Sequence, residues 1–215
     1  MTHLVAQAAP PGLDVVLRLT LETSDPTPLQ THWPALARTW PILAVKPTSE
    51  RCFAACCSTL DVDLICLSFD APLPFRLTPG LVRSARRRGV RFEVPYTSLL
   101  RGPFARRHAV ANGKRLVHAS GQRGGGKGLV VLTSRLGSTW EARRPREVIA
   151  LGRAMGLGEE AARRGVEVEA SAVIRRGMRR VEGWVPRSDP ATNREGKGGV
   201  EGTTPWMRVE ASRSE

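Results

Sequence analysis

Five short apolar stretches recur along the first two thirds of the chain, and a segment of helical character follows each of them. They lie near residues 15–21, 42–45, 64–69, 90–94 and 129–134. Their length and their Val, Ile, Leu and Phe content are typical of β-strands that are buried on both faces. Parallel strands of this kind need a covering helix in each crossover. The pattern therefore predicts a parallel sheet covered by helices.

Helix-start and helix-stop residues lie between these stretches. The clearest case follows the third stretch, where Thr78 is placed as N-cap, Pro79 suits the first helical position and Gly89 ends the helix. Further helices are predicted over residues 27–40, 50–59, 103–120, 145–155 and 171–180, and a short helix is predicted to start at residue 158. Regular strand–helix alternation without a dinucleotide-type glycine fingerprint favours a (β/α)₈ barrel over a doubly wound sheet.

The number of predicted strands is smaller than a complete barrel requires. A complete barrel has eight strands and about 250 residues, whereas this chain has 215 residues. We therefore predict an α/β, TIM-barrel-like domain over residues 13–185 that is incomplete at its N-terminal end. Residues 1–12 and 186–215 are predicted to be disordered, the latter because Gly, Ser, Thr, Pro and balanced charge dominate it.

The positive charge is concentrated in the middle of the chain. The net charge is +13, and residues 71–140 carry fourteen basic side chains but one acid, Glu93. Such a field attracts polyanions, of which nucleic acid is the usual one. No stretch approaches the roughly eighteen apolar residues of a spanning helix, and the N-terminus lacks the basic and apolar regions of a secretion signal. We expect a soluble intracellular protein that binds no membrane.

Two features that could indicate chemistry do not. Cys52, Cys56, Cys57 and Cys66 lie in an apolar context without the paired C-x-x-C spacing of a zinc site, so we predict buried free thiols. The run GQRGGGKG over 121–128 matches part of a phosphate-loop frame. However, a glycine replaces the Mg²⁺-binding Ser or Thr, and the run precedes a strand instead of following one. We predict a flexible loop insertion there.

Six segments, in colinear order over about residues 13–185, resemble the family of the 30-kDa protein subunit of nuclear ribonuclease P. The segments are LDVVLRLTLETSD, RCFAACCSTLDVDLICLSF, LPFRLTPGLVRSARRRGVRFEVPYTSLLRG, ARRHAVANGKRLVHASG, RRPREVIALGRAMGLGEEAARRGV and ASAVIRRGMRR. The resemblance implies a TIM-barrel-like protein without catalytic activity of its own. Family members begin with further βα units that have no counterpart upstream of Leu13, so we expect a shortened product.

The resemblance also implies partners and a location. Family members serve the ribonucleoprotein that removes the 5′ leader from precursor tRNA, and the related ribonuclease MRP that acts on rRNA precursors. The RNA subunit performs the chemistry with Mg²⁺, so no cofactor is expected on this chain. The expected partners are ribonuclease P RNA, precursor tRNA and other protein subunits of ribonuclease P and MRP. The expected location is the nucleus and nucleolus.

Arginines are the best candidates for RNA contact, because their forked guanidinium groups suit phosphate oxygens and stack on bases. The candidates are Arg87, Arg88, Arg101, Arg106, Arg107, Lys114 and Arg144. Arg106 and Arg107 match the family's paired arginines, and Arg144 matches the basic residue before its next helix. The alternative for each is a solvated or ion-paired side chain. The scarcity of acids near Glu93 argues against pairing for the set as a whole.

Two other functions stay open. A metal-dependent phosphoesterase would place ligands at the carboxyl ends of barrel strands. Asp61, Asp63 and Asp70 flank one strand, but Asp70 alone is at that end, and no H-x-H pair accompanies it. A protein-binding scaffold without RNA contact, or a defective isoform, would use the exposed edges of an incomplete barrel. Binding through phosphates would fall steeply with added salt, which separates these possibilities.

Overall fold

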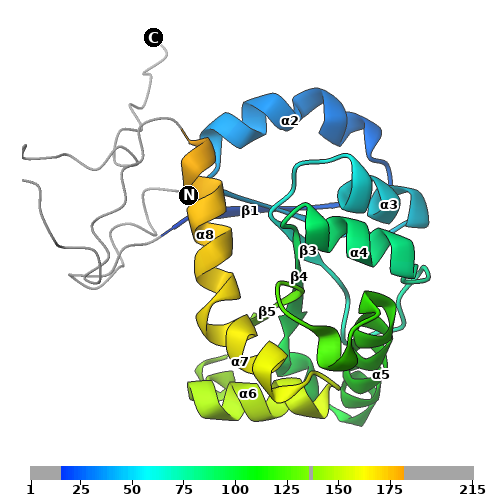
Figure 1. The fold of residues 1–215 in the computed structure, drawn as a ribbon, viewed down its shortest axis with the longest axis vertical. Coiled ribbons are helices and arrows are strands. Elements are labelled where there is room, and N and C mark those ends of the chain that lie inside the picture. Colours follow the sequence, from blue (N-terminus) through cyan, green and yellow to red (C-terminus); the bar gives the residue numbers. More distant parts are fainter. Residues whose placement is uncertain (1–15, 136–137, 182–215) are drawn as a thin grey trace, which may run out of the picture.

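A single parallel sheet organises the protein (Figure 1). The computed structural model describes residues 16–135 and 138–181. The strands are β1 (Arg18–Thr23), β2 (Ile42–Pro47), β3 (Leu64–Cys66), β4 (Arg91–Pro95) and β5 (Val130–Thr133). All four pairings are parallel, and the spatial order is the chain order. This is the order of a barrel wall, since a doubly wound sheet reverses its order partway. The predicted fold class is confirmed.

The helices follow the strands as predicted. They are α2 (Thr27–Thr39), α3 (Glu50–Ser58), α4 (Pro79–Arg87), α5 (Pro103–Ser120), α6 (Pro145–Ala154), α7 (Glu159–Glu167) and α8 (Glu169–Arg180), with 3₁₀ turns η1 (Tyr96–Leu99), η2 (Arg123–Gly125) and η3 (Thr139–Glu141). Helix α8 begins two residues before the predicted start. Thr78 precedes α4, but its side chain makes no capping hydrogen bond, whereas Gly89 ends the helix with φ +78° as predicted. The termini predicted to be disordered, 1–12 and 186–215, lie outside the described residues.

The main core lies between the outer face of the sheet and the helices that follow its strands. Phe53 of α3, Ile65 of β3 and Phe92 of β4 are fully buried there. The four cysteines are free and buried, as predicted. Burial raises the pKa of the Cys57 thiol to about 12, so it stays protonated at neutral pH. No helix of the described residues is long and apolar enough to cross a membrane.

The other, concave face of the sheet is covered by α8. Figure 1 shows α8 on the side of the sheet opposite α3 and α4. Val173 of α8 packs on Ile42, Leu64 and Val131, which point inward from three strands. The five described strands are thereby covered by helices on both faces of the sheet.

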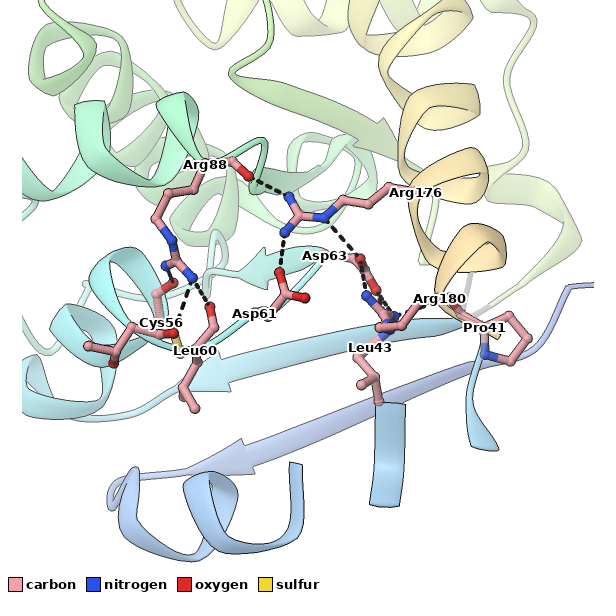
Figure 2. Close-up of polar contacts among 10 residues, drawn as sticks. Pro41, Leu43, Cys56, Leu60, Asp61, Asp63, Arg88, Arg176 and Arg180 are labelled. Atoms are coloured by element: carbon pink, nitrogen blue, oxygen red, sulfur yellow. Dashed lines mark hydrogen bonds and ion pairs between the residues drawn. The ribbon is translucent and has the colours of Figure 1, made fainter. Parts of the chain in front are cut away.

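Arginines of α8 attach it to the edge of the sheet where the strands begin (Figure 2). Arg180 donates two hydrogen bonds to the fully buried Asp63, at 2.9 and 2.6 Å. The Leu43 N–H, 2.9 Å away, also donates to this carboxylate. Arg176 bonds to Asp61 and donates to the Arg88 carbonyl oxygen at 2.7 Å. The buried charge is thus paired and hydrogen-bonded, which its burial requires.

The glycine-rich run is a packed turn, and the prediction of a flexible insertion is wrong. Gly124 has φ +67°, and a Cβ there would lie 2.8 Å from the Gly158 backbone. The Gly158 N–H donates to the Gly124 carbonyl oxygen at 2.9 Å, and the Gly128 N–H donates to Glu169 at 3.2 Å. Gly124 is required because its backbone approaches Gly158, the N-cap of α7, too closely for a side chain. They join the start of β5 to α7 and α8.

Two inward-facing carboxylates are expected to make the protein sensitive to acid. Burial by itself raises the pKa of Glu93, but the hydrogen bonds from Arg18, at 2.6 and 2.9 Å, outweigh burial and leave that pKa lowered. Burial also raises the pKa of Glu169, and its bonds to Arg91 and Arg164 likewise leave it lowered. A lowered folded-state pKa adds stability above the unfolded value near 4.3. That stability is lost as the pH falls through the folded-state pKa.

The test is urea unfolding at pH 7 and at stepwise lower pH. The unfolding midpoint is expected to hold down to about pH 5 and then fall steeply. Glu93→Gln should show a smaller loss between pH 7 and about pH 3.5 than the parent chain, because the group that titrates is gone. Glu159→Gln, which alters an exposed acid on α7, is the control and should keep the parent's pH dependence. Equal pH dependence in all three proteins would contradict the expectation.

Candidate nucleic-acid interface

The fold has two ends, and the predicted site residues divide between them. We call the end where the strands finish the carboxyl edge, and the end where they start the amino edge. Helices α5 and α6 follow β4 and β5, so they begin at the carboxyl edge and run back to the amino edge. In barrels the carboxyl edge carries the ligand site.

Four of the predicted arginines lie at the carboxyl edge. Arg101, Arg106 and Arg107 lie in the turn after β4 and the first turns of α5, and all three are exposed. The Nε–H of Arg106 also donates to the Leu99 carbonyl oxygen at 3.0 Å, which holds this part of the guanidinium group against the turn. Arg144 caps α6 through its backbone, whose N–H donates to Glu147 at 2.9 Å, so its exposed guanidinium is left for a ligand.

The other three predicted residues lie elsewhere. Arg87 and Arg88 are at the end of α4, at the amino edge. Arg88 donates to three carbonyl oxygens at the end of α3, those of Cys56, Thr59 and Leu60, at 2.7–3.4 Å (Figure 2). This pairing stabilises the carbonyls that a helix leaves unbonded, so Arg88 has a structural role. Lys114 is exposed on the flank of α5, beside Gly156.

Fewer basic side chains of residues 71–140 are unpaired than the scarcity of acids in that segment predicted. Acids from outside the basic segment pair with it in space. Arg91 bonds to Glu169 at 2.8 Å, and Arg101 lies 3.5 Å from Glu141 and 3.8 Å from Asp70. The last two distances are too long for hydrogen bonds, so the Arg101 guanidinium can still bind a ligand.

Two exposed aromatic residues at the carboxyl edge were missed from the sequence. Phe104, in the first turn of α5, is 77% exposed, and Trp140, in η3, is 88% exposed. The ion pair from Arg101 to Glu141 joins the two segments that carry them. Exposed aromatic side chains beside arginines provide stacking surfaces for unpaired bases. Trp140 lies three and four residues before Arg143 and Arg144, and this spacing could have identified it.

A polar cavity of about 290 Å³ opens at the same edge. It is lined by Lys46, Ser68, Phe69, Asp70, Pro95, Thr97, Ser98, Arg101 and Arg135, which follow or end β2, β3, β4 and β5. Arg135 has φ +43°, a left-handed conformation that a non-glycine residue seldom adopts. The Arg135 carbonyl oxygen accepts a hydrogen bond from Arg101 at 3.4 Å. The cavity therefore brings cations from separate strands together.

The carboxylates considered as metal ligands are separated by the fold. Asp61 and Asp63 lie at the amino edge and are paired with arginines of α8, whereas Asp70 lies at the carboxyl edge. Within residues 16–135 and 138–181, no group of three His, Cys, Asp or Glu side chains could hold a metal ion. The arrangement of the described residues therefore gives metal-dependent hydrolysis no geometric support.

Comparison with known proteins identifies relatives over most of the chain. The family model described as RNase P subunit p30 matches residues 4–182. The chain is 31% identical over 178 residues to ribonuclease P protein subunit p30 of Mus musculus, covering 82% of this chain and 65% of that protein. It is 30% identical over 169 residues to ribonuclease P/MRP protein subunit RPP1 of Saccharomyces cerevisiae, covering 79% and 56%. It thus spans less than two thirds of the length of these curated relatives.

A solved structure has the same fold. A chain from the cryo-EM structure of archaeal ribonuclease P with mature tRNA superposes with a TM-score of 0.66, at 14% sequence identity. The superposition covers 92% of this chain and 83% of that chain. The likeness confirms the fold predicted from the strand–helix alternation.

Proposed function

Because the chain belongs to the ribonuclease P subunit p30 family, we propose that it is a non-catalytic protein subunit of ribonuclease P that binds RNA through its carboxyl edge. The RNA would be the ribonuclease P RNA, and the process would be removal of the 5′ leader from precursor tRNA. The observation that carries the RNA-binding part is the combination, at one edge, of exposed Phe104 and Trp140 with exposed arginines.

The proposal extends to partners, cofactor and location. The curated relatives are named as ribonuclease P or ribonuclease P/MRP subunits, which supports other protein subunits as partners and a second role in ribonuclease MRP. In this proposal Mg²⁺ acts at the RNA subunit and the chain itself holds no cofactor. The site of action is the nucleus and nucleolus, where precursor tRNA and rRNA are processed in these assemblies.

RNA binding by the full chain is the direct test. The expected result for Trp140→Ala is about tenfold weaker binding of ribonuclease P RNA, because each stacked base contributes about 1–3 kcal/mol. The double variant Arg107→Gln with Arg144→Gln should reduce the dependence of binding on salt. The logarithmic slope should fall by about 0.7–0.9 for each phosphate that the variant no longer neutralises. Fluorescence anisotropy across a salt series measures both quantities.

The amino edge supplies a matched control. Arg83→Gln with Arg87→Gln removes the same charge from exposed positions on α4, at the other end of the fold, and should leave the salt slope unchanged. Equal losses in the two double variants would overturn the assignment to the carboxyl edge. Binding of partner subunits without any salt-dependent RNA binding would favour the scaffold alternative. Cleavage of precursor tRNA by the chain alone would overturn its non-catalytic role.

A further inference from the structure

We propose that the cavity at the carboxyl edge is a binding site for a phosphate monoester, either a free nucleotide or the phosphorylated end of an RNA strand. The proposal does not rest on the function proposed above, which concerns exposed side chains around the cavity. It rests on the side chains that line the cavity, the charge they carry and one buried hydroxyl.

The charge of the lining matches a phosphate dianion. Among the lining residues, Lys46, Arg101 and Arg135 contribute three positive charges and Asp70 one negative charge, which leaves two positive charges, and Lys46 also pairs at 3.0 Å with Glu22, which lies outside the lining. A phosphate monoester carries close to two negative charges above its second pKa of about 6. The arginines lie 3.5–3.9 Å from the carboxylates of Asp70, Glu141 and Glu93, so these ion pairs lack hydrogen-bond geometry. Guanidinium groups held in this way can turn to a stronger anion.

One buried hydroxyl indicates where the anion is held. Thr97 is 1% exposed and lines the cavity, and its Oγ1 has no hydrogen-bond partner among the described residues. A buried hydroxyl without a hydrogen-bond partner is destabilising, so its retention needs a reason. Donation of this hydroxyl to a phosphate oxygen would supply the missing partner. Ser68 and Ser98 add hydroxyl-bearing residues to the same lining.

Backbone geometry supports a prepared site. Arg135 follows β5 in a left-handed conformation, and strain of this kind is concentrated at ligand sites. A long hydrogen bond of 3.4 Å from Arg101 to the Arg135 carbonyl oxygen links the segments after β4 and β5 across the cavity. The volume of about 290 Å³ is near the lower limit for small-molecule sites.

Calorimetric titration of the full chain tests the site, with inorganic phosphate and adenosine 5′-monophosphate as probes. The parent chain should bind both, and adenosine should not bind. Thr97→Val, which keeps the size of the side chain, should weaken phosphate binding about tenfold or more, since it removes a hydrogen bond to a charged group. Arg101→Gln should weaken it by at least as much. Arg83→Gln removes an equal charge from the amino edge and should have no effect.

Asp70→Asn separates a phosphate site from a metal site. Removing a negative charge from the lining should tighten phosphate binding severalfold, whereas loss of a metal ligand would abolish anion binding. Competition by RNA oligonucleotides with a 5′-phosphate, but not with a 5′-hydroxyl, would identify an RNA end as the source. Competition by nucleotides alone would identify a free nucleotide.

Two results would overturn the proposal. One is the absence of phosphate binding at millimolar concentration, and the other is equal binding by the parent, Thr97→Val and Arg101→Gln. Failure here is distinguishable from failure of the proposed function. Salt-dependent RNA binding that needs Trp140 can persist without a phosphate site, and inorganic phosphate can bind without any RNA contact.

Discussion

Replacing Arg180 with methionine is expected to lower the free energy of unfolding by about 3–5 kcal/mol. Asp63 is 0% exposed, and Arg180 supplies both charge-assisted hydrogen bonds to its carboxylate. Removing Arg180 leaves the buried carboxylate with only the more distant Arg176, whose Nε lies 3.6 Å from Asp63 Oδ1, and loss of one partner of a buried ion pair is the costly case. Methionine keeps much of the apolar volume of the side chain, so the change in packing contributes little. Urea unfolding, with the denaturant slope compared between variants, measures the effect.

A surface pair and a rescue variant make this test specific. Arg163→Met removes an exposed pair with Glu159 on α7, with N and O atoms 3.2 Å apart, and should cost under about 1 kcal/mol. Asp63→Asn combined with Arg180→Met should recover part of the loss, because no buried charge is left unpaired. Equal costs for Arg180→Met and Arg163→Met would contradict the importance assigned to the α8 anchor.

Gly177→Ala is expected to lower the free energy of unfolding by up to about 2 kcal/mol, although alanine is the better helix former. A Cβ at Gly177 would overlap the Pro41 carbonyl oxygen, which lies at the start of β2. Helix propensity alone would stabilise the variant by about 1 kcal/mol. The overlap forces α8 away from the sheet, and overpacking of this kind costs about 1–3 kcal/mol. The sign of the change in the free energy of unfolding therefore reports how closely α8 approaches the start of β2.

Gly80→Ala is the matched control. Gly80 lies in the first turn of α4, and a Cβ there would meet nothing within 4 Å. It should raise the free energy of unfolding by up to about 1 kcal/mol. Opposite signs for the two glycine variants, measured by urea unfolding, are the expected result. A stabilising effect of Gly177→Ala would mean that α8 is not seated on β2 as described.

The sheet was predictable because local pattern determines it. Each apolar stretch pairs with its neighbour in the chain, so predicting the strands also predicts their order. In β4, apolar and charged residues alternate, and this pattern says more about the two faces of the strand than a continuous apolar run would. Phe92 and Val94 face the outer core, whereas Arg91 and Glu93 pair with charged residues on the concave side. This alternation of apolar and charged residues predicts a strand with one polar face.

The site was only partly predictable. A helix between two parallel strands must run from the carboxyl edge to the amino edge. Arginines at the end of α4 therefore lie at the opposite end from those at the start of α5. This rule places Arg87 and Arg88 away from Arg106 and Arg107 without any coordinates. The position of α8 was not predictable in this way, because Arg180 and Asp63 are 117 residues apart in the chain.

The covering of the concave face by α8 has a consequence for synthesis of the protein. The five strands leave the ribosome in their final order, and each can pair with the one before it as it emerges. Among the described residues, Glu169–Arg180 is the segment that packs on their inner apolar side chains, and it is translated after all five strands. Until then these side chains lack that packing partner and can contact other chains. Chaperone dependence should therefore be concentrated in the interval before α8 is released.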